Sequence, residues 1–106
     1  MKSLGRLTPA TADVLEVLLD SGDAVWGLRI VKTTGRPAGS VYPILERLEG
    51  LGWTTSQWED APDRAGPRRR LYVLKEGARA SAVAVVEEVW QRRQAKMAGP
   101  VRAAQS

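Results

Sequence analysis

Apolar residues recur at helical spacing through the first half of the chain, where they predict three short helices. The first starts at Thr8-Pro9 and stops at Ser21-Gly22-Asp23. Threonine followed by proline is a strong start signal, because the hydroxyl can cap free amides and proline needs no donor there. The second helix is expected over residues 25–35, and the third over residues 40–52, with Gly52 as a left-handed cap.

After residue 52 the helical spacing gives way to short runs of β-branched and aromatic residues. Residues 53–59 and 70–74 have this composition, and residues 60–67 between them hold two prolines, one glycine and two aspartates. The pattern predicts a β-hairpin with a long polar tip. From Lys75 onward the residues favour a final helix, which Gly99-Pro100 is expected to end.

Three helices with a tight turn before the third, followed by a hairpin, are the order of a winged helix-turn-helix, whose third helix enters the DNA major groove. The expected fold is therefore mainly α with a β-hairpin wing (α+β). We divide the chain into a DNA-binding domain (residues 1–75), a C-terminal dimerisation helix (76–98) and a flexible tail (99–106).

The third helix has an apolar side and a side with few long side chains. At 100° per residue the apolar side is formed by five core residues: Val41, Ile44, Leu45, Leu48 and Leu51. Gly39, Pro43, Glu46 and Gly50 lie opposite. Proline lacks the amide that would bond residue 39, and a glycine there leaves room for the bend. The expected result is a slim outer face that can approach a groove floor closely.

Hydroxyl and charged groups flank this slim face. Ser40, Tyr42 and Arg47 can all donate to phosphate oxygens, and Glu46 can accept from a cytosine amino group. Two other interpretations stay open, a helix-capping Ser40 and a half-buried Tyr42.

Composition narrows the function classes. The chain has 106 residues, a length that suits one domain. Its net charge of +4 points weakly toward a polyanionic partner. Cysteine and histidine are absent, which excludes thiol nucleophiles, imidazole bases, disulfides and most zinc sites. We therefore expect neither an enzyme nor a cofactor. The chain has no apolar run of transmembrane length and no apolar leader, so we expect a cytoplasmic protein without a membrane partner.

Charge is unevenly distributed. Four acids are the only charges between residues 7 and 28: Asp13, Glu16, Asp20 and Asp23. Four arginines crowd the wing: Arg64, Arg68, Arg69 and Arg70. Side chains alternate along a strand, so Arg68 and Arg70 should project together and Arg69 the other way. Such a cluster suits phosphate contact, although a solubilising loop is the simpler alternative.

The segments "SVYPILERLEGLGW", "SQWED" and "GPRRRLYVLKEG" together resemble the PadR family of bacterial transcriptional regulators, over roughly residues 7–88. The resemblance implies a winged-helix DNA-binding domain with a C-terminal dimerisation helix, usually a repressor that releases its operator when an effector binds. By motif position, Ser40 and Tyr42 match phosphate-contacting residues, Arg47 a basic position of the helix, and Arg69 and Arg70 the base of the wing.

The final helix carries an apolar stripe expected to pack against a second copy. It consists of Val83, Val86, Trp90 and Met97, widened by Val85 and Val89. Trp90 can be an interface anchor or, as in some drug-sensing relatives, the wall of a pocket for a small aromatic effector.

The sequence therefore predicts a homodimeric repressor of a double-stranded DNA operator. The DNA-binding residues are predicted to be Arg36, Ser40, Tyr42, Glu46, Arg47, Arg68, Arg69 and Arg70. The dimer interface is predicted to contain Val83, Val86, Val89, Trp90 and Met97. The alternative is a winged-helix module that has lost DNA binding and docks a protein partner through the same faces.

Overall fold

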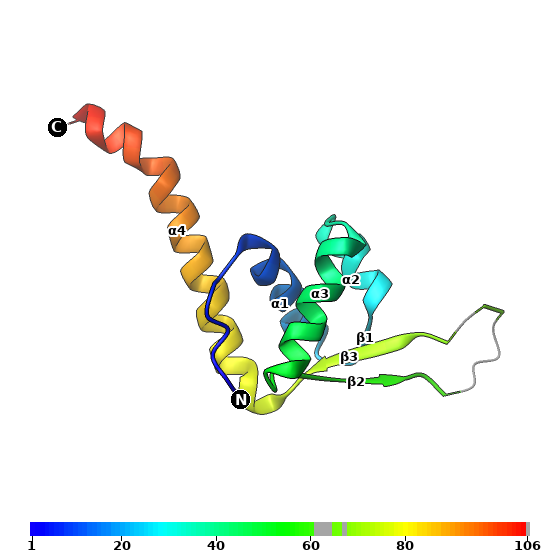
Figure 1. Ribbon diagram of the computed structural model, residues 1–106. Coiled ribbons are helices and arrows are strands. Elements are labelled where there is room, and N and C mark those ends of the chain that lie inside the picture. Colours follow the sequence, from blue (N-terminus) through cyan, green and yellow to red (C-terminus); the bar gives the residue numbers. More distant parts are fainter. Residues whose placement is uncertain (61–64, 67, 106) are drawn as a thin grey trace.

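The computed structural model describes residues 1–60, 65–66 and 68–105 (Figure 1). In chain order the elements are α1 (Pro9–Ser21), β1 (Val25–Trp26), α2 (Gly27–Thr34), α3 (Ala38–Gly50), β2 (Thr54–Trp58), β3 (Arg70–Leu74), a 3-10 turn (Glu76–Ala78) and α4 (Arg79–Gln105). The three helices and the hairpin that the sequence predicts are present in the predicted order. The Arg64 position lies outside the described residues.

The ends of α1 and α3 follow the local signals in the sequence. The Thr8 hydroxyl accepts a hydrogen bond from the Thr11 amide at 3.2 Å, and Gly22 ends α1 with a φ of 64°. Gly52, after α3, has a φ of 84°, a conformation that residues with a Cβ rarely adopt. Both helix ends are therefore fixed by the residues that the sequence pattern singled out.

The segment before α2 is a strand, which corrects the predicted helix start at residue 25. Val25 and Trp26 pair with Tyr72 and Leu71 of β3, so the sheet has three strands in the order β1-β3-β2. The two hairpin strands, β2 and β3, pair with each other as expected. Their pairing runs from Thr54 opposite Leu74 to Trp58 opposite Arg70. Valine and tryptophan are good strand formers, and pairing with a preformed hairpin decides their conformation.

The core lies between α1, α2, α3 and the first half of α4. Its largest fully buried apolar side chains are Leu15, Ile30, Leu45, Leu48, Val14 and Val41. The predicted apolar side of α3 is confirmed, with Ile44 and Leu51 partly buried at its edge. Because one side of α3 is buried in this core, the opposite side of the helix faces solvent.

The first turns of α4 belong to this core, which corrects the predicted dimer interface at Val89. Val89 is 4% exposed and Val85 9%, and both join Ala78 and Ala82 in a stripe that is part of the same buried cluster. Val86 is partly buried against it. The reason is that α4 has two apolar stripes, and α1, its principal contact, covers the one that includes Val89.

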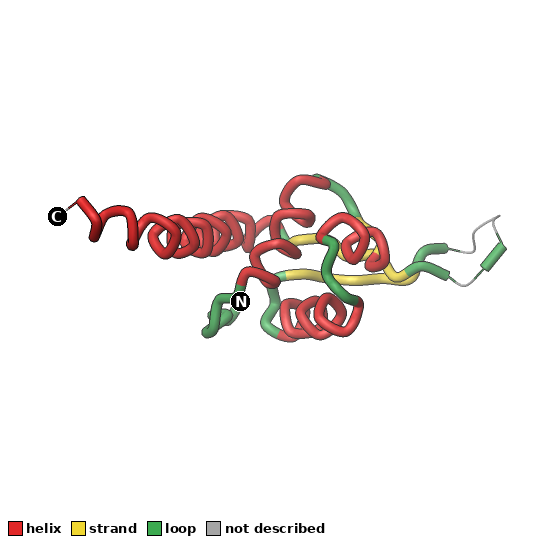
Figure 2. The backbone as a smooth tube through the Cα atoms, turned by 90° about the horizontal axis from the view of Figure 1, so that it is seen from above, coloured by secondary structure: helices red, strands yellow, loops and turns green. Residues whose placement is uncertain are grey.

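The final helix does not end at Gly99-Pro100 as predicted. α4 continues through both residues to Gln105. Proline removes one backbone hydrogen bond and glycine adds flexibility, but alanine-rich flanking sequence favours helix on both sides. The later part of α4 projects away from the rest of the molecule (Figures 1 and 2).

Candidate nucleic-acid interface

The outer side of α3 is open, as its sequence predicts. Ser40, Pro43 and Glu46 are exposed, and a Cβ added at Gly39 would meet nothing within 4 Å. The helix continues through Pro43, whose missing amide falls on this outer side. Glu46 therefore lies on an unobstructed helix surface, where its carboxylate can approach a partner.

Ser40 is not the capping residue of α3. Pro37 occupies the N-cap position without a side-chain cap bond, and the Ser40 amide donates to the Pro37 carbonyl at 2.9 Å. The Ser40 hydroxyl lies one turn inside the helix and is exposed. This excludes the capping interpretation and leaves the hydroxyl available to a ligand.

Tyr42 connects α3 to the start of α2. A Cβ at Gly27 would lie 2.9 Å from Cε1 of Tyr42 and 3.3 Å from its hydroxyl, so the ring lies directly over this glycine. The side chain is still 37% exposed. The ring is therefore half-buried against Gly27, while phosphate contact by its hydroxyl stays a prediction.

Tyr72 lies beneath this contact, on β3. Its ring also approaches Gly27, at 3.3 Å from the same Cβ position. Burial raises the pKa of Tyr72 above its usual value, and the positive charge of Arg70 offsets this only in part. Tyr72 therefore stays neutral at physiological pH and supports the Tyr42 ring as a packing residue.

Two of the predicted phosphate contacts already have partners within the chain. Nε of Arg36 lies 2.7 Å from Oδ2 of Asp13 on α1. The Arg47 guanidinium donates to the main-chain carbonyl of Leu4. Arg36 fastens the turn between α2 and α3 to α1, and Arg47 fastens the segment before α1 to α3.

The wing arginines divide between the two faces of the sheet, as the alternation predicts. Arg69 stacks on Trp26, with its Cζ atom 3.8 Å from the ring centroid. Arg70 donates to the Ser56 hydroxyl at 3.1 Å and lies 5.2 Å over Trp58. These tryptophan partners escaped the sequence analysis, although Trp26 and Trp58 are strand residues of the type that pairs across a sheet.

Among the described arginines of the wing, Arg68 carries the most accessible charge. Its side chain is exposed, whereas the amide of Arg69 donates to Glu59 at 3.0 Å and Arg70 lies 3.6 Å from a carboxylate oxygen of Glu49. The described part of the wing therefore offers one exposed arginine beside two that help to hold the hairpin against α3 and β1.

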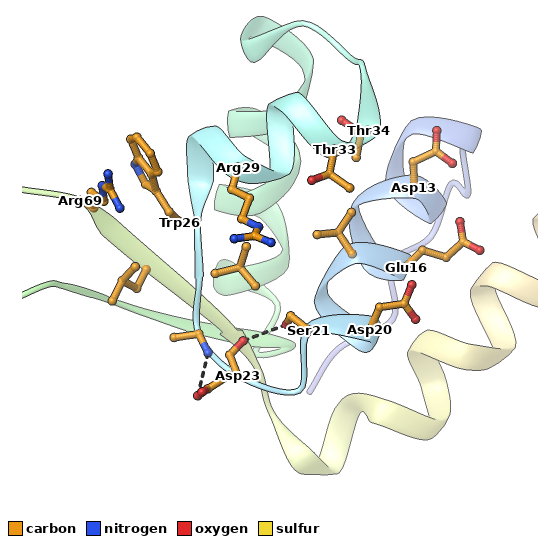
Figure 3. A pocket seen from close by; sticks show the side chains of 14 residues that line it. Asp13, Glu16, Asp20, Ser21, Asp23, Trp26, Arg29, Thr33, Thr34 and Arg69 are labelled. Atoms are coloured by element: carbon orange, nitrogen blue, oxygen red, sulfur yellow. Dashed lines mark hydrogen bonds between the residues drawn. The ribbon is translucent and has the colours of Figure 1, made fainter.

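An acidic groove of about 790 Å³ lies between α1, α2 and β1 (Figure 3). Glu16 and Asp20 extend from α1 along one side, and Trp26 and Arg69 stand at the other. Asp23 caps the amide of Ala24 at 3.1 Å. The carboxylates would repel phosphate, so this groove is distinct from a nucleic-acid surface.

An apolar stripe remains exposed on α4. Val83 is 43% exposed, Trp90 47% and Met97 78%, and the Arg93 guanidinium lies 5.6 Å from the Trp90 ring centroid. Trp90 is absent from the lining of the acidic groove and from that of a second groove, of about 720 Å³, beside the first residues of the chain.

Two further features are absent from the described part of the chain. It contains no group of three or more acidic, histidine or cysteine side chains placed to hold a metal ion. None of its helices is both long and apolar enough to cross a membrane.

The family model described as "Transcriptional regulator PadR-like family" matches residues 14–82. This match covers α1 to the start of α4 and includes the open side of α3 and the wing. No curated protein matches the sequence significantly.

Solved structures share the fold at low identity. The circadian clock associated protein Pex from anabaena is 18% identical with a TM-score of 0.65, over 83% of this chain and 80% of Pex. The protein smu.1704 from Streptococcus mutans UA159 is 22% identical with a TM-score of 0.64, over 93% of this chain and 94% of its own. NadR in complex with 4-hydroxyphenylacetate is 20% identical with a TM-score of 0.61, over 92% of this chain and 66% of NadR. These likenesses confirm the predicted winged-helix fold.

Proposed function

Because this chain belongs to the PadR-like family of transcriptional regulators, it is a DNA-binding regulator and not an enzyme, and we propose that it acts in the cytoplasm as a homodimeric repressor. The observation that carries the proposal is the open side of α3. A helix buried on one side by Val41, Leu45 and Leu48 presents only small or polar groups on the other. That geometry suits insertion into a major groove.

The proposed contacts follow from which groups are available. The hydroxyls of Ser40 and Tyr42 and the guanidinium of Arg68 are exposed and donate to phosphates, while Glu46 faces the base edges. Arg36, Arg47 and Arg70 contribute positive charge near this surface, and Arg69 does so from the edge of the acidic groove. Their contacts within the chain give them a second task, which is to hold α3 and the wing in place.

Dimerisation and effector response belong to the same proposal. The exposed stripe of Val83, Trp90 and Met97 packs against the α4 helix of a second copy, with Val86 at its edge. A small aromatic effector that contacts Trp90 at this interface would change the spacing of the two α3 helices. NadR, which shares the fold, was solved with a small aromatic acid.

Salt dependence of DNA binding tests the proposal directly. Three to five cationic contacts per subunit should each displace counterions, so a plot of log affinity against log salt should have a slope on the order of −5 to −9 for a dimer. Fluorescence anisotropy with labelled genomic fragments measures it. Absence of binding to every fragment, or a flat slope, would favour the protein-docking alternative.

The Arg68→Ala variant is expected to make the salt slope shallower by about 2 for a dimer, because each subunit loses one phosphate contact. The affinity for all DNA sequences should fall by about the same factor. Lys96→Ala, which removes one exposed charge from the projecting part of α4, is the matched control and should leave the slope unchanged. An unchanged slope for Arg68→Ala would remove this residue from the interface.

The Glu46→Gln variant is expected to change base preference more than overall affinity. A carboxylate accepts from the cytosine amino group, whereas an amide pairs with adenine, and such a pair discriminates by about 1–3 kcal/mol. Selection from a randomised duplex pool, for wild type and variant in parallel, measures this preference. A uniform change in affinity with the same selected sequence would show that Glu46 reads no base.

A further inference from the structure

The segment before α1, residues 1–7, is fastened along α3 and the strand that follows it. We call it the N-terminal strap. The amide of Lys2 donates to the Leu51 carbonyl at 2.9 Å, and the indole of Trp53 donates to the Lys2 carbonyl at 2.6 Å. Arg47 donates to the Leu4 carbonyl, and the Leu4 side chain is only 3% exposed. The strap is therefore an ordered part of the fold.

The charged side chains of the strap take no part in its anchoring. Lys2 and Arg6 are exposed, and no ion pair within the described residues involves either of them. All three anchors use main-chain atoms of the strap, and Gly5, with a φ of 74°, turns the chain between the two basic residues. The main chain that carries these two exposed cations is thus held by hydrogen bonds that do not involve their charged groups.

The position of the strap relates these cations to the proposed DNA surface. Figure 2 shows the segment that leads from the N-terminus on the same side of the sheet as α3. In Figure 1, α3 lies between the strap and the hairpin, so the strap flanks α3 on the side opposite the wing. Arg47 links α3 to the strap directly, through its hydrogen bond to the Leu4 carbonyl.

From this arrangement we propose that the N-terminal strap is a third DNA-contacting element, in which Lys2 and Arg6 bind backbone phosphates on the side of α3 opposite the wing. The proposal rests on the DNA binding proposed above. Phosphate is the matching partner because both residues are exposed cations with no ion-pair partner within the described residues, on a segment that is fastened to α3. Arg47 is then a positioning residue that holds the strap against α3.

The double variant Lys2→Ala/Arg6→Ala tests the strap without loosening it, because its anchors are main-chain groups. Binding to a labelled mixed-sequence duplex should have a salt slope shallower by about 3–4 for a dimer, since four contacts are lost. The control Arg29→Ala/Lys96→Ala removes the same charge from the acidic-groove side of α2 and from the projecting part of α4, and should leave the slope unchanged.

The role of Arg47 is tested by combining variants. Arg47→Ala alone should make the slope shallower, but added to the Lys2→Ala/Arg6→Ala background it should have little further effect, because its contribution passes through the strap. Arg47→Lys, which keeps a donor, should restore most of the wild-type slope. Additive losses would instead make Arg47 a direct phosphate contact.

The outcomes separate the two proposals. If wild type binds with a steep slope and the Lys2→Ala/Arg6→Ala variant matches it, the strap proposal is wrong and DNA binding stands. If the control double variant loses as much as the strap variant, only net charge matters and the strap proposal is again wrong. If wild type binds no duplex, the proposed function fails and the strap proposal fails with it.

Discussion

Truncation of the chain after Val83 is expected to unfold the domain instead of releasing a folded monomer. The removed part of α4 contains Val85 and Val89, both buried in the cluster that also holds Leu15 and Leu18 of α1. Burying a valine is worth about 1.5–3 kcal/mol, so the pair contributes about 3–6 kcal/mol. A small domain has a free energy of unfolding of roughly 5–15 kcal/mol in total, so this loss removes a large part of it and, for a domain at the lower end, all of it.

Thermal unfolding followed by circular dichroism measures this effect. A chain truncated after Gln91 is the matched control, because it keeps the buried Val85 and Val89 and loses the projecting part of α4. It should unfold cooperatively near the wild-type temperature, whereas the shorter chain should show no cooperative transition. A cooperative transition near the wild-type temperature for the shorter chain would show that α4 is not part of the core.

The presence of one buried and one exposed apolar stripe on α4 marks a limit of sequence reasoning. Both apolar stripes of the helix repeat at helical spacing, and spacing alone shows that they exist without showing what covers each. Val89 lies in one stripe and Trp90, its neighbour in sequence, in the other. Which stripe meets α1 depends on the rotation of α4 about its axis, which distant parts of the fold determine.

The same distinction between local and distant causes runs through the rest of the fold. Both ends of α1 and the C-terminal end of α3 were predictable because a cap, a proline or a glycine acts within a few residues, whereas α3 starts at Ala38 and not at the predicted residue 40. β1 was not, since a two-residue strand exists only through its pairing with Tyr72 and Leu71, more than forty residues later. A local pattern of Val25 and Trp26 next to a helix gives no sign of that partner.

In the candidate site, the exposure of side chains was easier to predict than their hydrogen-bond and ion-pair partners. The periodicity of α3 placed Glu46 on the open side and Ser40 on its flank, and both are exposed, because one buried side of a helix fixes the other. The partners of Arg36 and Arg47 are 23 and 43 residues away in sequence, on α1 and in the N-terminal strap. The local sequence around a surface arginine does not show whether its guanidinium has such a distant partner.

The Trp90→Ala variant is expected to dissociate the proposed dimer while leaving each subunit folded. Trp90 is 47% exposed and lies outside the buried cluster, so removal of the ring leaves every residue of that cluster in place. It stands midway between Val83 and Met97, seven residues from each, which is the spacing of a helix–helix seam. An exposed aromatic at the centre of such a stripe is the residue type that anchors interfaces.

Loss of the dimer should reduce operator affinity far more than any single phosphate contact does. Two linked half-site interactions gain about 10²–10⁴ in affinity over one, so the variant should weaken binding to a full operator by a factor in that range. Binding to an isolated half-site should change little, since every residue of α3 and the wing remains in place. Gln91→Ala, at the exposed neighbouring position, is the control and should behave as wild type.

Light scattering at tens of micromolar, with anisotropy on full and half operators, separates the possible outcomes. Monomeric Trp90→Ala with wild-type thermal unfolding and weak binding to the full operator would establish α4 as the interface. A variant that stays dimeric but no longer responds to aromatic acids would make Trp90 the wall of an effector pocket. A monomeric wild type that binds a full operator tightly would contradict the dimer altogether, because a single α3 then supplies all of the affinity.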